Sequence, residues 1–299
     1  MKFGVRLHPF GTYPDVPAMV ETVQRMEKLG YDFIYLPEHT IFPVEHERKM
    51  GRTFYETMTI ATHLAALTST IRFYTAVLVL TQHNPIYLAK QAATLDITSN
   101  GRIGLGVGIG WLEEEIAWLG CEVRGRGKIL EEYIEVMRTL WRDDPASFSG
   151  ERIAFENASF NPKPVQKPLP IYIGGTVKVS PSRAARMGDG WMPSSAPFAE
   201  FKEGLARLWR EMDALGRPRA GFPVFRKMTL YTLPEEIQEH TKETGAESER
   251  GFEGDLDRAK DYVAECEALG VTHMPILFST HYEEFREQAE RFAQAMIRK

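Results

Sequence analysis

Short apolar runs of β-type composition alternate with longer amphipathic stretches along the 299-residue chain. Runs rich in β-branched and aromatic residues, bounded by glycine, proline or charged residues, are typical of strands. Eight such runs predict strands over residues 3–7, 32–36, 71–79, 102–110, 170–175, 189–193, 225–232 and 271–278.

The stretches between these runs have the apolar periodicity of helices. In the first of them, Val16, Met19, Val23 and Met26 recur at spacings of three or four residues. That pattern stops at the glycine of KLGYD, and the last but one stops at the glycine of ALGVT, as helices do before a strand. Strand–helix units repeated eight times predict an α/β fold, a (β/α)8 TIM barrel, with a doubly wound open sheet as the alternative.

Two segments interrupt this alternation. Residues 143–167 are rich in proline and polar residues, and residues 234–255 are charged and contain glycine. We expect both to be insertions, the second being either an excursion between barrel units or a solvated surface helix with a loop. No shift in composition marks a second domain, so residues 1–299 are predicted to form a single TIM-barrel domain with these insertions.

Composition narrows the class of protein. The formal net charge of −5 and the pI near 6.0 argue against a general nucleic-acid binder. We expect no secretory leader, and no apolar run is long enough to cross a membrane. Cys121 and Cys266 lie far apart without a CxxC motif, so no disulfide framework is predicted and a cytoplasmic protein is expected.

The run RIGLGVGIGW, residues 102–111, has glycine at every second position from 104 to 110. This spacing does not match the G-x-G-x-x-G fingerprint of a Rossmann loop. Strict alternation instead puts the glycines on one face of a strand and Ile103, Leu105 and Val107 on the other. We expect the aliphatic face to pack on helices and the glycine face to leave an interior groove for a flat ring; the alternative is tight packing of barrel-interior side chains.

Polar and aromatic side chains follow several predicted strands, where the active sites of barrels lie. His8 follows the first strand, His39 the second, Gln82 and His83 the third, and Trp111 the fourth. The first strand lacks the HxH pattern of binuclear metal hydrolases, so no metal site is predicted. A neutral imidazole at this edge can bond to a cofactor carbonyl or ring nitrogen and relay a proton near pH 7.

The fifth predicted strand ends in Gly174-Gly175-Thr176, followed by Lys178 and a helix that opens near Ser180. Free amides at the start of a helix, a glycine turn and a lysine together suit a phosphate group. The chain has no G-x-S-x-G, Walker or H-E-x-x-H motif, which leaves redox chemistry on a bound flat cofactor.

Five segments match a known family in chain order: LGYDFIYLPEH, TAVLVLTQHNPIYLAKQAATLD, SNGRIGLGVGIGWLEEE, FNPKPVQKPLPIYIGG and AARMGDGW. On these segments the chain resembles the bacterial luciferase-like monooxygenase superfamily, and most closely its coenzyme F420-dependent branch. The resemblance implies a (β/α)8 barrel with insertions, in a homodimer, that holds a flavin or deazaflavin at the C-terminal mouth of the barrel.

The resemblance also implies roles for individual residues. It places a non-prolyl cis peptide at Ala76-Val77, in a bulge that presses on the cofactor ring at the end of the third strand. His39 matches a histidine that faces the reactive ring. The residues expected to bind the cofactor are His8, His39, Ala76, Val77, Gly106, Gly108, Gly174, Gly175, Thr176 and Lys178.

Two positions depart from the pattern of the relatives. Flavin-using luciferases have a phosphate-binding arginine where this sequence has Ile109, which favours F420 over FMN. F420-dependent sugar-phosphate dehydrogenases have a catalytic carboxylate where this sequence has Trp111, which argues against a sugar-phosphate substrate.

We therefore expect an oxidoreductase that transfers a hydride between coenzyme F420 and a small organic substrate. His39 and Trp111 are its expected catalytic residues: His39 bonds to or protonates the reactive centre, and Trp111 forms a wall of the substrate pocket. One alternative is an FMN-dependent monooxygenase that uses oxygen and reduced flavin from a separate reductase. The second alternative is a non-catalytic barrel that binds flavin or a partner.

Overall fold

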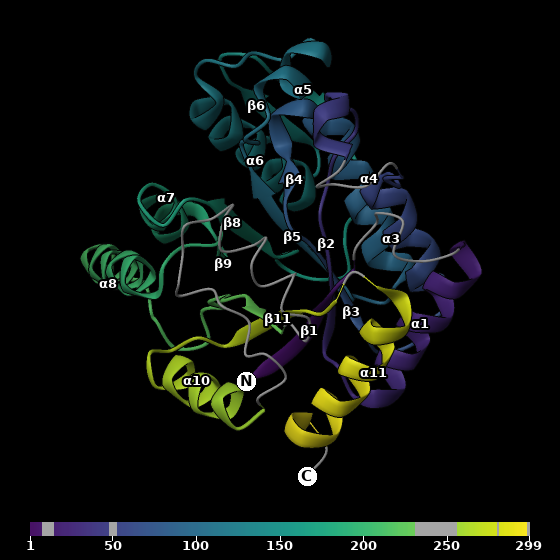
Figure 1. Ribbon diagram of the computed structural model, residues 1–299. Helices are drawn as coiled ribbons and strands as arrows, with labels where there is room; N and C mark the ends of the chain where they lie inside the picture. Colours follow the sequence, from purple (N-terminus) through teal and green to yellow (C-terminus); the bar gives the residue numbers. More distant parts are fainter. Residues whose placement is uncertain (8–14, 48–52, 231–255, 280, 298–299) are drawn as a thin grey trace.

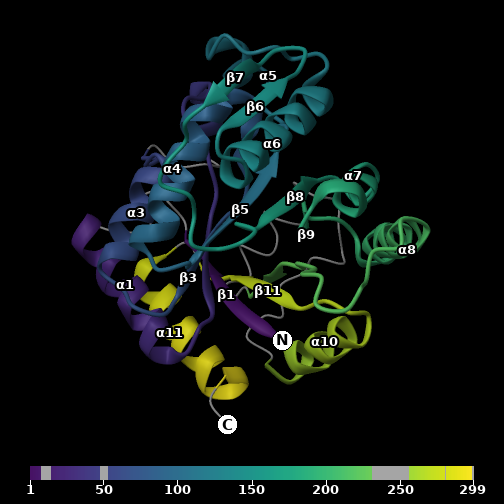
Figure 2. The same cartoon turned by 180° about the vertical axis from the view of Figure 1, so that it is seen from behind.

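A computed structural model describes residues 1–7, 15–47, 53–230, 256–279 and 281–297 (Figure 1). Its parallel strands curl around a common axis and helices cover the outside of the sheet, as Figure 2 shows from behind. The strands of the main sheet are β1 (Lys2–Arg6), β2 (Phe33–Leu36), β3 (Arg72–Thr75), β4 (Leu78–Val79), β5 (Ile103–Gly108), β8 (Ile171–Gly175), β9 (Gly190–Pro193), β10 (Met228–Thr229) and β11 (His273–Leu277). They are hydrogen-bonded in the order β10-β11-β1-β2-β3-β5-β8-β9, and β4 pairs with β5.

The segment 224–229 closes the ring of strands. Val224 bridges to Trp191 of β9, and Phe225 bridges to His273 at the start of β11. β10 then continues along β11 in parallel register. The (β/α)8 barrel predicted from the sequence is therefore confirmed, and the open-sheet alternative is wrong because the two ends of the sheet meet.

The helices follow the apolar stripes of the sequence and connect successive strands. The carboxylate of Asp15 accepts a hydrogen bond from the amide of Ala18 at 2.8 Å and so caps the first helix, which ends at Gly30 with φ of 91°. Gly270 has φ of 92° and ends the helix before β11 in the same way. The helices are α1 (Val16–Leu29), α3 (Thr57–Ala66), α4 (Pro85–Thr98), α5 (Glu113–Trp118), α6 (Arg126–Arg142), α7 (Ser180–Met187), α8 (Phe198–Ala214), α10 (Leu256–Ala268) and α11 (Tyr282–Phe292). Shorter segments are the 3-10 helices η1 (Val44–His46) and η2 (Leu80–Gln82) and the π-helix η4 (Ala293–Ile297).

Two layers of apolar side chains hold the barrel together. The outer layer lies between strands and helices and includes Ile103, Leu105 and Val107, which confirms the outward direction of the aliphatic face of β5. A separate inner layer fills the barrel with aromatic rings and one thioether. Its buried members are Phe33, Tyr35, Tyr74, Tyr172, Met192 and Phe225.

The elements differ from the predicted ones in two strands. The predicted strand 71–79 is split into β3 and β4. Of the predicted strand 225–232, residues 225–230 are described, and within them the strand pairing is limited to β10 and the bridge at Phe225. Within 143–167 the chain forms an antiparallel hairpin of β6 (Ala146–Ser149) and β7 (Ala154–Ala158), outside the barrel sheet. The segment 234–255 and His8 lie outside the described residues. In the described part, no helix has the length and apolarity needed to span a membrane.

Candidate active site at the barrel mouth

The carboxyl ends of the parallel strands bring distant residues to one edge of the barrel, called the mouth here. β2 leads to His39, β3 to Ala76, β5 to Trp111, and β8 to the loop after Gly175. Among the described residues, no group of three or more histidine, cysteine, aspartate or glutamate side chains could hold a metal ion.

A bulge interrupts the third barrel strand at the mouth. The peptide bond between Ala76 and Val77 is cis, as the family resemblance implied. The amide of Ala76 donates to the carbonyl of Leu36 at 2.6 Å, and the hydroxyl of Thr75 donates to the carbonyl of Gly106 at 2.8 Å. The bulge is thus tied to the strands on both sides, and Ala76 and Val77 remain partly exposed.

The glycine face of β5 is packed, and the expected interior groove is wrong. A Cβ atom would lie 2.7 Å from an aromatic ring at Gly104, 2.1 Å from the carbonyl oxygen of Thr75 at Gly106, and 2.7 Å from Val77 at Gly108. Inner aromatic side chains and the backbone of the bulge fill the space that a ring would need. The glycines therefore let the bulge approach β5, which is the alternative of tight interior packing.

The side chain of Val77 lies between two of the glycines expected to bind the cofactor. One of its methyl groups would be 2.7 Å from a Cβ at Gly108, and the other 2.5 Å from a Cβ at Gly174. A flat ring at the mouth would consequently rest on the bulge at Ala76-Val77. The glycines lie beneath the bulge and support the position of the bulge.

A buried carboxylate holds the residues that follow the bulge. Glu38 is 6% exposed; its Oε2 accepts a hydrogen bond from the amide of Val79 at 2.6 Å, and its Oε1 lies 2.9 Å from Nε2 of His83. Burial lowers the pKa of His83, but its hydrogen bond and attraction to Glu38 outweigh burial and raise it on balance. This pair stabilises the segment after the cis peptide.

A second buried carboxylate lies behind His39. Glu115 is 1% exposed, and its Oε2 lies 2.8 Å from Nδ1 of His39. Its Oε1 accepts hydrogen bonds from the amides of Thr40 at 2.5 Å and Ile41 at 3.2 Å. Burial raises the pKa of Glu115, but the hydrogen bonds from His39 and the two amides outweigh burial and hold it below its usual value.

This contact determines which nitrogen of His39 carries the proton. Because Glu115 is ionised at neutral pH and only accepts hydrogen bonds, Nδ1 of His39 must be the donor. Nε2 makes no hydrogen bond to any residue that the structure describes. The neutral imidazole therefore presents an acceptor at Nε2 that can take up a proton and return it.

Aromatic rings surround His39. The ring centroids of Phe42, Phe54 and Trp111 lie 6.1, 5.4 and 5.8 Å from that of the imidazole, each in an edge-to-face arrangement. Trp111 also meets His46 edge to face at 5.6 Å, yet it is 61% exposed. Trp111 thus covers one side of His39 and offers the rest of its ring to a molecule at the mouth.

The loop after β8 offers backbone donors close to the start of α7. The amides of Thr176, Val177 and Lys178 make no hydrogen bond to the described residues, and Gly175 has φ of 119°. The Lys178 side chain is 76% exposed, and its Nζ lies 3.5 Å from a carboxylate oxygen of Glu200. Three free amides, a lysine and a helix start can together hold an anion.

Sequence reasoning missed Glu115 and the role of Glu38. A signal for Glu115 was present, because Leu112, Glu115 and Ile116 have the i, i+3, i+4 spacing of one helix face. All three are buried, at 4%, 1% and 0% exposure. A buried glutamate on an apolar helix face needs a hydrogen-bond partner for its carboxylate, and a histidine or backbone amides can supply one.

Residues 1–298 match the family model described as luciferase-like monooxygenase. The chain belongs to this family. It is 34% identical over 227 residues to an uncharacterized protein of Mycobacterium tuberculosis, covering 71% of this chain and 78% of that protein. It is 33% identical over 187 residues to the F420-dependent glucose-6-phosphate dehydrogenase of Amycolatopsis mediterranei, covering 61% of this chain and 55% of that protein.

The fold recurs in solved structures. The monooxygenase RslO1 from Streptomyces bottropensis superposes with a TM-score of 0.79 at 23% identity, and 99% of each chain is covered. The luciferase-like family has both F420-dependent and flavin-dependent members, and its members are oxidoreductases and monooxygenases. The resemblance found in the sequence is therefore confirmed at the level of the family.

Proposed function

We propose that this chain is an oxidoreductase that transfers a hydride between coenzyme F420 and a small organic substrate. The observation that carries the proposal is the His39–Glu115 pair, which leaves Nε2 of His39 free to exchange a proton at the mouth. The similarity to a relative named for F420, at 33% identity, supports the choice of coenzyme.

The residues present fit a flat cofactor with a phosphate group. The partly exposed bulge at Ala76-Val77 would support the ring, and His39 would face it across the mouth. The free amides of residues 176–178 and the side chain of Lys178 would bind the phosphate. When bound, the coenzyme supplies the hydride chemistry, and the protein supplies position and proton transfer.

The chain's own residues divide the remaining tasks. His39 holds or moves a proton at Nε2, with Glu115 fixing its ring and tautomer through Nδ1. Trp111 excludes water from one side of His39 and offers an apolar surface to the substrate. Glu38 keeps the bulge in place through the amide of Val79.

Coenzyme binding tests the proposal before any substrate is known. The purified protein would be titrated with F420 and, separately, with FMN, each followed by fluorescence. We expect saturable binding of F420 in the micromolar range and at least tenfold weaker binding of FMN. Micromolar binding of FMN alone would instead support the second candidate, an FMN-dependent monooxygenase that needs oxygen and a separate reductase. The flavin-dependent members of the family are the reason for this second candidate.

His39→Ala tests the proton-transfer role. Turnover of F420 with simple alcohols, or of its reduced form with ketones and enones, should fall about 10²- to 10⁴-fold, the usual contribution of a general acid or base. The affinity for F420 should change by less than about threefold, because the phosphate loop and bulge remain. His63→Ala, at an exposed histidine on α3, is the matched control and should leave turnover unchanged. Equal turnover in both variants would contradict the role of His39.

We further propose a cytoplasmic homodimer. The chain has a mass of 34.0 kDa, so light scattering after size exclusion should give about twice that value if the proposal holds. A single-chain mass at micromolar concentration would contradict it.

A further inference from the structure

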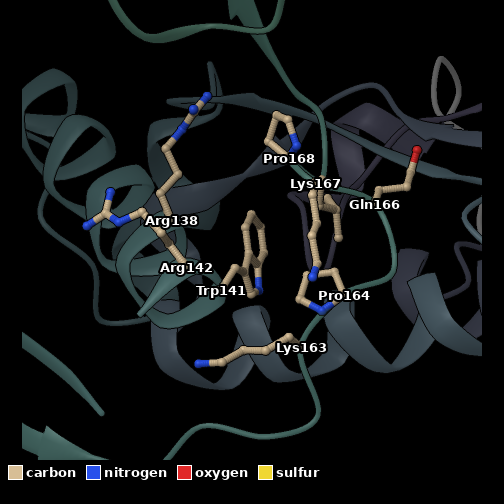
Figure 3. A pocket seen from close by; sticks show the side chains of 9 residues that line it. Arg138, Trp141, Arg142, Lys163, Pro164, Gln166, Lys167 and Pro168 are labelled. Atoms are coloured by element: carbon tan, nitrogen blue, oxygen red, sulfur yellow. The ribbon is translucent and has the colours of Figure 1, made fainter. Parts of the chain in front are cut away.

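A cavity lies far from the mouth. It has a volume of about 400 Å³ and lies between the last turns of α6 and residues 163–169, which precede β8 (Figure 3). Ligand sites usually measure about 300–1,000 Å³, so this volume suits a ligand of one or two rings.

The helix α6 separates this cavity from the mouth. At its first residue, the guanidinium of Arg126 donates to the carbonyls of Ile109 and Gly110, which belong to the mouth. At its last residue, Arg142 lines the cavity. The helix has 17 residues and rises about 1.5 Å per residue, so the two places lie roughly 25 Å apart. No group assigned to the cofactor or substrate reaches the cavity.

The walls of the cavity are held by hydrogen bonds to the barrel. The side-chain amide and the backbone amide of Gln166 donate to the carboxylate of Asp96 at 2.6 and 2.9 Å. The indole Nε1 of Trp141 donates to the carbonyl of Ala89 at 3.1 Å, which fixes the plane of the ring. Because both walls are fixed by buried groups, the cavity is formed before any ligand arrives, which lowers the entropic cost of binding.

Four of the nine described residues that line the cavity are basic, and none of the nine has a carboxylate. Arg138 and Arg142 each pair with a neighbouring carboxylate, and Lys163 donates to backbone carbonyls at the end of α6. Lys167 makes no ion pair or hydrogen bond with the described residues. Asp189 and Asp143 pair with the two arginines, and the charge of Glu135 also acts on Arg142. Three carboxylates thus stand against the four cations, and the one positive charge left in excess, that of Lys167, favours an anion.

The other surfaces of the cavity are flat and apolar. Figure 3 shows the ring of Trp141 on one side of the space, with Pro164, Lys167 and Pro168 on the other. A ring placed between an indole face and proline rings would bury apolar surface on both of its sides. Its anionic substituent could then reach the ammonium group of Lys167.

We propose that this cavity is a second ligand site, which binds a planar aromatic anion. The ring lies against Trp141, and a carboxylate or phosphate group on it pairs with Lys167. Such a molecule occurs either as a nucleotide or as an aromatic carboxylate, and both have the same chemistry at this site. The proposal does not depend on the coenzyme or the reaction at the mouth.

Calorimetric titration with AMP and with 2-naphthoate tests the site. We expect at least one probe to bind to a single site, with adenosine alone and inorganic phosphate alone binding at least tenfold more weakly. Binding of AMP only would identify the nucleotide as the source, and binding of 2-naphthoate only the aromatic carboxylate. Failure of both probes to give saturable binding would overturn the proposal.

Three lysine variants locate the binding. Lys167→Gln should weaken the affinity about tenfold, since it removes the anion's partner without disturbing a buried contact. Lys178→Gln at the mouth and Lys260→Gln on the exposed face of α10 make the same change of charge elsewhere, and each should alter the affinity less than twofold. An effect of Lys178→Gln as large as that of Lys167→Gln would move the binding to the mouth and refute the second site. Equal affinities in all three variants would also refute it.

Discussion

Replacing Glu115 should separate its two roles, which are to accept hydrogen bonds from the amides of Thr40 and Ile41 and to fix the tautomer of His39. The roles can be separated because the two carboxylate oxygens have different partners. Glu115→Ala leaves the amides of Thr40 and Ile41 and the imidazole of His39 without an acceptor. A hydrogen bond to a charged group contributes about 1.5–3 kcal/mol. Because these three part-buried donors can turn partly to water, the free energy of unfolding should fall by about 3–6 kcal/mol. In Glu115→Gln the side-chain carbonyl can keep both amides, and the loss should be only about 1–3 kcal/mol.

The glutamine variant should also change the tautomer of His39. Its side-chain NH₂ group would face Nδ1, which must then accept a hydrogen bond, so the proton would move to Nε2. Two-bond ¹H–¹⁵N spectra of protein with ¹⁵N-labelled histidine report the tautomer, and His39→Ala assigns the signal. Urea unfolding measures the two losses of stability.

Glu114→Gln is the matched control, because Glu114 is the exposed neighbour of Glu115 on the same helix. It should change the free energy of unfolding by less than about 0.5 kcal/mol and leave the histidine spectrum as in the wild type. The reasoning would be refuted if Glu115→Gln kept the proton on Nδ1 of His39, or if both Glu115 variants were as stable as the control.

Three further predictions concern the barrel. Burial lowers the pKa of His273 to about 3, whereas the unfolded chain binds this proton near pH 6.5. The free energy of unfolding should therefore fall by about 1.4 kcal/mol per pH unit as the pH drops from about 6.5 towards 3. Urea titrations at several pH values should show a smaller slope of stability against pH in His273→Gln. Gly106→Ala places a Cβ 2.1 Å from the carbonyl oxygen of Thr75 and should lower stability by about 1–3 kcal/mol or more, so wild-type stability in this variant would contradict the packing role of the glycine. Asp96→Asn puts an amide where a buried carboxylate accepts two hydrogen bonds from Gln166, and thermal melting should show a loss of about 1–3 kcal/mol; an unchanged melting temperature would count against this anchor.

The sequence by itself determined the barrel and the composition of its mouth. Apolar periodicity is a local property, since each strand and helix must bury one face, and the predicted strands therefore coincide within about two residues with β1, β2, β5, β8, β9 and β11. It also placed His39, Trp111 and the glycine loop after β8 at one edge, because parallel strands in a barrel end on the same side. The cis bond at Ala76-Val77 came from the family resemblance, which periodicity could not supply.

Only the tertiary structure decided what these residues touch. Glu115 lies 76 positions from His39, and the two meet because the ends of β2 and β5 face the same mouth. The glycine face of β5 is filled because the bulge at Ala76-Val77, which splits the predicted strand 71–79, brings the carbonyl of Thr75 against Gly106. The cavity beside Trp141 forms where α6 meets residues 163–169, which follow the β6–β7 hairpin. Contacts of this kind arise when the whole ring of strands closes, so no local pattern of residues encodes them.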